Sequence, residues 1–176
     1  GFRYIMRTPI LRSLILLEAF YGLFAMNQVM ITLVAREELG VGPEGLGGLL
    51  SADAVGASLG VVALLVLGAT SRPGRFATIA TMGYAVSMAA FAASGSYVPA
   101  FLALVGCGLC DALVSVTRNS MMQLAAPAGM RGRVMANQGT IVRGVGPLAQ
   151  SQSGVLAGLL GAPVATLVAG LSLIHI

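Results

Sequence analysis

A chain of 176 residues that is 57% hydrophobic and only 9% charged is too apolar for a soluble domain, which usually carries about a quarter charged residues. Its net charge of +4 comes from arginine alone, and most of the arginines flank long apolar runs, so membrane topology explains them better than nucleic-acid binding. Because the apolar runs are long and do not alternate with polar residues, the sequence predicts an all-α integral membrane protein.

Six apolar segments follow one another along the chain. At about 20 residues per span, the sequence predicts spans near residues 13–35, 45–68, 76–94, 98–126, 134–160 and 163–170. Residue 1 is not methionine, and the last six residues, LSLIHI, resemble the translation of an adapter used in DNA library preparation. We therefore expect a fragment with a truncated sixth span, in which residues 171–176, including the only histidine, His175, are a scar outside the fold.

The charges outside these spans are distributed unevenly between alternate connections. One side holds only arginines: Arg3, Arg7, Arg12, Arg72, Arg75, Arg131 and Arg133. The other side is net negative and holds Arg36, Glu37, Glu38 and Glu44. Because positive residues concentrate on the cytoplasmic side of a membrane, the pattern predicts that the chain start and the arginine-rich turns are cytoplasmic.

Charged residues also occur deep inside the predicted spans, where an ionised group is costly unless it faces protein, water or a counter-charge. Asp111 and Arg118 lie seven residues apart on one face, with Arg118 about 12 Å from the end of its span, and Arg143 lies about 15 Å inside the next. Two interpretations remain open for Asp111 and Arg118: they line a pathway, or they are structural, as an ion pair or as a snorkelling arginine near the cytoplasmic end. Matching depths between antiparallel helices favours Glu18 as the partner of Arg118, and Asp53 or Asp111 as the partner of Arg143.

Three predicted spans carry a distinct face. The first has a polar stripe at helical spacing, made of Glu18, Tyr21, Ala25, Gln28 and Thr32. The second has a face of small residues that lets another helix approach closely, made of Gly48, Ala52, Gly56 and Gly60. The fifth is predicted to be kinked and to carry one polar face, made of Arg143, Pro147, Gln150 and Gly154.

The segment PAGMRGRVMAN, preceded by RNSMMQL and followed by GVGPLAQSQSGVLAGLLG, resembles the carboxy-terminal half of a major facilitator superfamily transporter. The nearest branch is that of bacterial exporters similar to the enterobactin exporter. The most specific part is the basic turn with Arg131 and Arg133, where Ala128 stands in place of a frequent acidic residue. The turn GATSRPGR is similar to the family's cytoplasmic loop but lacks its aspartate, so Arg72 and Arg75 are either gating residues or anchors at the membrane surface.

This resemblance implies a six-helix bundle that forms half of a twelve-helix secondary exporter in a bacterial inner membrane. Its substrate would be a small amphipathic compound such as a drug or siderophore, and its driving force proton antiport. In the family's plan the first and fourth helices line the cavity, while the second and fifth pack near the other half, which is expected to cover the small-residue face. The candidate pathway residues are Glu18, Gln28, Asp111, Arg118, Asn119, Arg143 and Gln150, with Asp111 or Glu18 as proton carrier and Asp53 as an ion-pair partner. The alternative is a non-transporting six-span membrane or assembly protein.

No catalytic residue is predicted. Cys107 and Cys110 form a CxxC motif, but they lie in an apolar run without a second ligand pair, so they are interpreted as core residues and not as a redox or zinc site. Without His175, no Ser-His-Asp set can be assembled. We therefore expect no enzymatic activity, no cofactor and no metal. The expected partners are the lipid bilayer, the missing amino-terminal half and a small-molecule substrate, without nucleic acid.

Overall fold

The computed structural model describes residues 2–25, 28–68 and 72–174, and these ranges contain helices but no strand. The helices are α1 (Phe2–Arg7), α2 (Pro9–Phe24), α3 (Gln28–Glu37), α4 (Pro43–Leu67), α5 (Pro73–Ala92), α6 (Tyr97–Ala125), α7 (Arg131–Leu160) and α8 (Ala162–Ile174), with a short 3-10 turn at Ala128–Met130. The prediction of an all-helical protein is confirmed.

Proline and glycine mark several helix ends. Pro9, Pro43 and Pro73 occupy the first turns of α2, α4 and α5, where the missing N–H is not needed and the fixed φ suits a helix. Gly68 and Gly161 follow α4 and α7 with φ of 72° and 81°, a left-handed conformation that favours glycine at a helix end. Pro147 does not end α7, which continues through it to Leu160.

The first predicted span is divided into two helices. Its helical conformation ends at Phe24, because Ala25 is extended with ψ of 152°, and α3 begins at Gln28. The expected continuous stripe from Glu18 to Thr32 is therefore wrong. No proline or glycine lies between Phe24 and Gln28 to explain the break, and residues 26–27 lie outside the described ranges.

Within the described ranges, three segments are long and apolar enough to cross a membrane: Pro9–Glu37, Pro43–Val66 and Tyr97–Ala125. They correspond to the first, second and fourth predicted spans, the first one containing both α2 and α3. The shorter apolar helix Ala162–Leu173 is the start of the sixth. That α5, α7 and α8 also cross a membrane stays a prediction.

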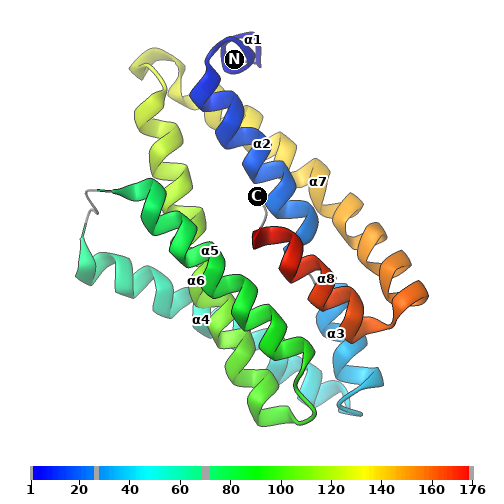
Figure 1. The fold of residues 1–176 in the computed structure, drawn as a ribbon. Coiled ribbons are helices and arrows are strands. Elements are labelled where there is room, and N and C mark those ends of the chain that lie inside the picture. The colour runs from blue at the N-terminus through cyan, green and yellow to red at the C-terminus, as the bar shows by residue number, and fades with distance from the viewer. Residues whose placement is uncertain (1, 26–27, 69–71, 175–176) are drawn as a thin grey trace.

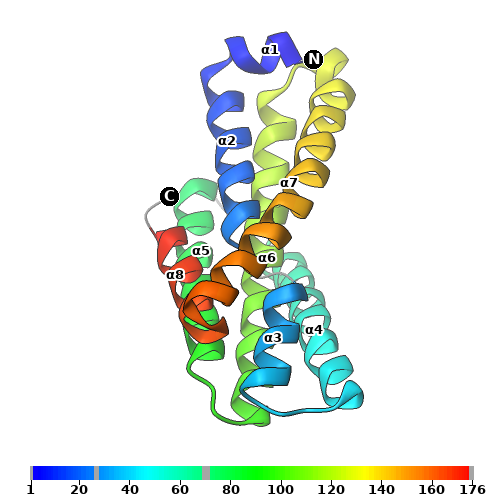
Figure 2. The same ribbon diagram turned by 90° about the vertical axis from the view of Figure 1, so that its right-hand side faces the viewer.

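Successive connections lie at opposite ends of the bundle. In Figure 1, α1 and the α6–α7 turn lie at the top, whereas the end of α4 and the start of α5 lie at the left, nearer the middle. The α3–α4, α5–α6 and α7–α8 connections lie toward the lower right. In Figure 2, α1 lies across the end of the bundle, beside the start of α2 and the α6–α7 turn. The chain start and the α6–α7 turn thus share one end, and the segment with Glu37, Glu38 and Glu44 lies at the other.

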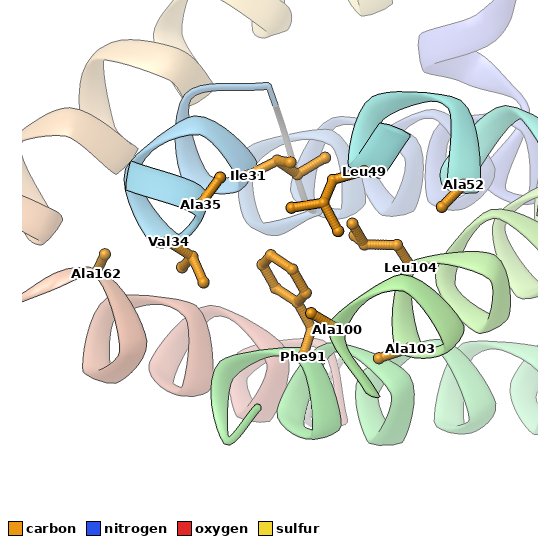
Figure 3. Close-up of a cluster of buried hydrophobic side chains, with 10 residues drawn as sticks. All are labelled: Ile31, Val34, Ala35, Leu49, Ala52, Phe91, Ala100, Ala103, Leu104 and Ala162. Carbon is orange, nitrogen blue, oxygen red and sulfur yellow. The ribbon is translucent and has the colours of Figure 1, made fainter. Parts of the chain in front are cut away.

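Three apolar clusters follow one another along the bundle. The cluster in Figure 3 joins α3, α4, α5, α6 and α8, with the fully buried Phe91 directed between Val34 and Leu49. The middle cluster surrounds Tyr21 and Tyr84, and the third packs α1 and α2 against the ends of α6 and α7. Glu18 of α2 and Arg118 of α6 lie between the middle and third clusters along their helices.

Residues 171–174 belong to α8. Leu171–Ile174, which the sequence analysis places outside the fold, continue α8, and Leu173 is buried in the middle cluster. The reason is that an apolar LSLI extends a helix as readily as any other apolar sequence. Residues 175–176 lie outside the described ranges, and the adapter origin of the segment stays a prediction.

The small-residue face of α4 is already covered within this chain. A Cβ added to Gly56 would collide with the carbonyl of Val105, and a Cβ added to Gly108 would collide with the carbonyl of Asp53. A Cβ added to Gly60 would also collide with α6, at the carbonyl of Leu109, and Ala52 is fully buried. The expectation that the face of Gly48, Ala52, Gly56 and Gly60 awaits the missing half is therefore wrong. Because α6 presents a glycine of its own, the two backbones can meet directly.

Candidate functional site

The charged and polar side chains of α2 and α6 form one buried cluster. Glu18 and Tyr21 are three residues apart on α2, and Asp111 and Arg118 are seven apart on α6, so each pair shares a helix face. The side chain of Arg118 is 3% exposed and that of Glu18 is 13% exposed. Tyr21 is also buried and packs against the ring of Tyr84, with centroids 5.5 Å apart.

Specific contacts link these four side chains. Nε of Arg118 lies 2.5 Å from Oε2 of Glu18, as the depth argument predicts. The guanidinium carbon of Arg118 lies 4.6 Å from the centroid of the Tyr21 ring, which is the range of a cation–π interaction. The hydroxyl of Tyr21 donates a hydrogen bond of 2.8 Å to Oδ1 of Asp111. Tyr21 thus connects the ion pair to the second carboxylate, and we call these four residues the charged cluster.

The charged cluster has an unequal number of positive and negative groups. When Glu18, Asp111 and Arg118 are all ionised, two carboxylates face one guanidinium, and one negative charge remains. Nη1 of Arg118 is buried and has no hydrogen-bond partner among the described residues. In a membrane interior a net charge is costly, so uptake of one proton or one cation would bring the cluster to neutrality.

A cavity of about 200 Å³ lies beside the charged cluster. It is bounded by α2, α5, α6 and the end of α8, and its lining is mainly apolar, with Tyr21, Thr78, Thr81 and Arg118 as polar contributors. Its volume is below the roughly 300–1,000 Å³ typical of pockets for drug-sized ligands. The cavity can admit water or a small group to Arg118.

Asn119 makes a contact that the sequence analysis missed. Its Oδ1 accepts a hydrogen bond of 2.6 Å from Nε2 of Gln138, a buried residue of α7. Gln138 lies four residues after the buried Val134 and seven before Val145, so helical periodicity could have placed it on the packed face of α7. The bond ties α6 to α7 near the arginine-rich turn. That Asn119 lines a pathway stays a prediction.

Arg143 does not join the charged cluster. It is exposed, and no carboxylate among the described residues lies within 4 Å of it, so its predicted pairing with Asp53 or Asp111 is wrong. The reason is that α7 packs through a different face, while Asp111 is held by Tyr21. Asp53 is half-buried on α4, and its backbone, but not its carboxylate, forms the close crossing with α6.

The remaining candidates lie outside the charged cluster. Gln28 and Gln150 are exposed on α3 and α7. Arg72, Arg75 and Arg133 are exposed at one end of the bundle. Arg131 has a local role, because its Nε donates a hydrogen bond of 3.3 Å to the carbonyl of Ala126 and so stabilises the turn between α6 and α7.

The cysteines show no metal-binding arrangement. Cys107 is buried, Cys110 is partly buried, and both are free thiols. In the ranges that the structure describes, no three His, Cys, Asp or Glu side chains are grouped so that they could hold a metal ion. Instead, Cys107 packs in the middle apolar cluster beside Tyr84.

Comparison with known proteins agrees with the membrane-spanning helices. A family model described as "transmembrane secretion effector" matches residues 1–176. A similar curated protein is the multidrug efflux pump Tap of Mycolicibacterium fortuitum, 29% identical over 167 residues, which cover 92% of this chain and 39% of that pump. No solved structure matches. The chain is thus a multi-pass membrane protein of the transmembrane secretion effector family, in the major facilitator superfamily of transporters.

Proposed function

We propose that this chain forms the carboxy-terminal six-helix half of a proton-coupled secondary exporter. Its substrate is a small amphipathic compound such as a drug or siderophore, and it works in the plasma membrane of a bacterium with the arginine-rich turns in the cytoplasm. Twelve-helix transporters of this kind have two six-helix parts that rock about a site between them. The chain spans 39% of the length of the efflux pump that it matches, which supports the proposal that a further set of spans completes the transporter.

The charged cluster is the observation that carries the proposed coupling. Buried ionisable groups in a membrane protein are costly, and they occur mainly where ions, protons or substrates move. In this cluster Asp111 is held by a neutral hydroxyl, whereas Glu18 is paired with Arg118. Asp111 is therefore the carboxylate that can change its protonation without breaking an ion pair. We assign it the role of proton carrier and assign Tyr21 and Arg118 the role of positioning it.

Asp111→Asn in the full-length transporter is expected to lower proton-driven efflux at least about tenfold while leaving membrane insertion intact, because it removes a titratable charge but little volume. The measurement is efflux from vesicles with an imposed pH gradient, normalised to the amount of transporter in the same membranes. Glu44→Gln is the matched control, since Glu44 is exposed in the first turn of α4 and lies outside the charged cluster.

Equal efflux by wild type and Asp111→Asn would contradict the assigned role of Asp111. Tyr21→Phe sharpens the test, because it removes only the hydrogen bond to Asp111 and keeps the aromatic ring under Arg118. It is expected to shift the pH dependence of efflux without abolishing it. A purely structural role of Tyr21 would lower the amount of protein and leave the pH profile of the remaining transporter unchanged.

The 176-residue chain alone is not expected to export substrate, because alternating access needs two parts that move about a shared site. Extending the reading frame upstream is the simplest observation. A second set of six spans, with its own basic loop between the second and third, would support the proposal. A start codon immediately before Gly1, or full transport by the isolated chain, would contradict it.

A further inference from the structure

Asp53 differs from the other two carboxylates inside the predicted spans. Glu18 pairs with Arg118, and Asp111 accepts a hydrogen bond from Tyr21, whereas no arginine among the described residues lies within 4 Å of the Asp53 carboxylate. Asp53 lies ten residues, or about 15 Å, from the start of α4, near the middle of a hydrocarbon layer about 30 Å thick. A carboxylate at this depth is costly when it is ionised, so Asp53 marks a functional position.

The side of α4 that lipid contacts lies away from Asp53. Most of the exposed large apolar residues of α4 share that side: Val55, Leu59, Val62 and Val66. At 100° per residue, they lie about 180–240° around the helix from Asp53. Asp53 itself is half-buried and lies about 60° from Gly56, at the border of the face that packs on α6. The carboxylate therefore faces protein or water and not lipid.

The crossing of α4 and α6 brings Asp53 within about one helical turn of Asp111. The backbone carbonyl of Asp53 packs against Gly108 of α6. Asp111 follows Gly108 by three residues, which is about 4.5 Å along the helix axis and about 60° around it. Asp111 is also the central residue of α6, fourteen residues from each end, so the two aspartates lie at similar depth. Their carboxylates are close enough to repel each other electrostatically.

The other ionisable groups around Asp53 do not neutralise it. α4 packs against α6 and α3. The ionisable side chains of these three helices are Cys107, Cys110, Asp111 and Arg118 on α6, Arg36 and Glu37 on α3, and Glu44 on α4 itself. Of these, Asp111 and Cys107 interact electrostatically with Asp53. Arg118 is engaged in the ion pair of the charged cluster, and Arg36 is exposed in the last turn of α3.

We infer that Asp53 is a second proton-binding residue of the exporter, coupled to Asp111 across the α4–α6 crossing, so that each transport cycle takes up two protons. This inference rests on the proposed function, because it adds a residue to the same proton pathway. When Glu18, Asp53 and Asp111 are all ionised, they face one guanidinium, and two negative charges remain.

One proton on each aspartate removes these two charges and leaves the ion pair of Glu18 with Arg118 intact. Each proton adds to a carboxylate oxygen from one side of the membrane and leaves it toward the other side. No other bond forms or breaks, and no further reactant is needed.

The first test is an infrared titration of the full-length transporter in reconstituted membranes, which follows the C=O stretch of protonated carboxyl groups and needs no substrate. Asp53→Asn and Asp111→Asn are each expected to remove one titrating group. Because the groups interact, each substitution is also expected to shift the midpoint of the remaining aspartate by about one pH unit, equally in both variants. Glu44→Gln, exposed in the first turn of the same helix, is the matched control and is expected to leave both midpoints unchanged.

The second test is the pH dependence of ethidium efflux from the same membranes. Wild-type efflux is expected to rise with about the second power of proton activity, and efflux by Asp53→Asn with about the first power. Asp53→Glu keeps a carboxyl group and is expected to restore the steeper dependence. A purely structural role of Asp53 would lower the amount of transporter and leave the steepness of the remaining activity unchanged.

The outcomes separate the inference from the proposed function. If neither midpoint shifts in the single variants, the aspartates are not coupled, and the inference is overturned. If Asp53 stays ionised throughout the titration, it is paired with a basic group outside this chain, and the inference is overturned as well. If Asp53→Asn does not accumulate, Asp111→Asn alone gives the coupling, since Asp53 is then the remaining group. If the wild type titrates as expected but exports nothing, the proposed function fails, whereas the titration still establishes two coupled proton sites.

Discussion

Gly108→Leu is expected to separate α4 from α6 and to prevent accumulation of folded protein. A side chain at this position would meet the carbonyl of Asp53, and the reciprocal contact of Gly56 with Val105 leaves neither backbone free to move away. Overpacking a core usually destabilises by about 1–3 kcal/mol, and a collision with backbone on both helices is expected to exceed that range. The measurement is the temperature at which the detergent-solubilised chain loses its monodisperse elution peak.

Gly47→Leu is the matched control for this substitution. Gly47 lies on α4 as well, it is exposed, and no neighbouring atom lies within 4 Å of the position of an added Cβ. Because leucine has a higher helix propensity than glycine, this variant is expected to keep or slightly raise stability. Equal stability of Gly108→Leu and wild type would show that α4 and α6 do not cross through these glycines.

Glu18→Ala is expected to destabilise the chain by about 3–5 kcal/mol, because it leaves Arg118 charged and unpaired in a buried position. The double variant Glu18→Leu with Arg118→Met is expected to recover much of this loss, since replacing both members of a buried ion pair by apolar residues is often neutral or stabilising. Thermal stability in detergent measures both variants. Transport by the double variant in the full-length protein is expected to remain impaired, because Tyr21 and Asp111 lose the guanidinium that positions them.

This combination of results separates stability from function. If the double variant is stable and transports normally, the ion pair is a structural element and takes no part in the pathway. If the double variant is as unstable as Glu18→Ala, the two side chains contribute through packing and not through their charges. Arg118→Met alone, which leaves Glu18 unpaired, and Glu18→Leu alone complete the thermodynamic cycle and give the coupling energy of the pair.

The helices and the ion pair could be predicted from the sequence because they depend on local chemistry. Apolar runs of membrane length become helices whatever surrounds them, since the backbone must satisfy its own hydrogen bonds. Glu18 and Arg118 could be matched because both lie at similar depth from the same end of the bundle, and two buried opposite charges stabilise each other. The sequence predicts that Tyr21 lies on the polar face of α2, but it does not predict the hydrogen bond from Tyr21 to Asp111.

The failed predictions concern which neighbour covers a given helix face. The spacing from Gly48 to Gly60 predicts that another helix approaches α4 closely, but this pattern does not identify which helix it is. Gly108 on α6 gives no separate signal, because in the sequence it is one residue of an apolar run. The pairing of Arg143 was predicted from its depth in the membrane. Depth does not give the rotation of α7 about its axis, which turns the side chain of Arg143 away from α6. The break after Phe24 carries no proline or glycine signal in the described residues. Such features depend on which helices pack together, and the residue pattern of one helix does not show this.

The ion pair between α2 and α6 also has a consequence for biosynthesis. One hundred residues separate Glu18 from Arg118, so at about 5–20 residues per second the ribosome needs roughly 5–20 seconds to supply the partner. During this interval α2 reaches the membrane with a carboxyl group and no arginine beside it. A carboxyl group is far less costly to bury in lipid as the neutral acid than as the carboxylate. The neutral form of Glu18 is therefore the less costly one while α2 lacks its partner, and the ion pair can form only after Arg118 has been synthesised.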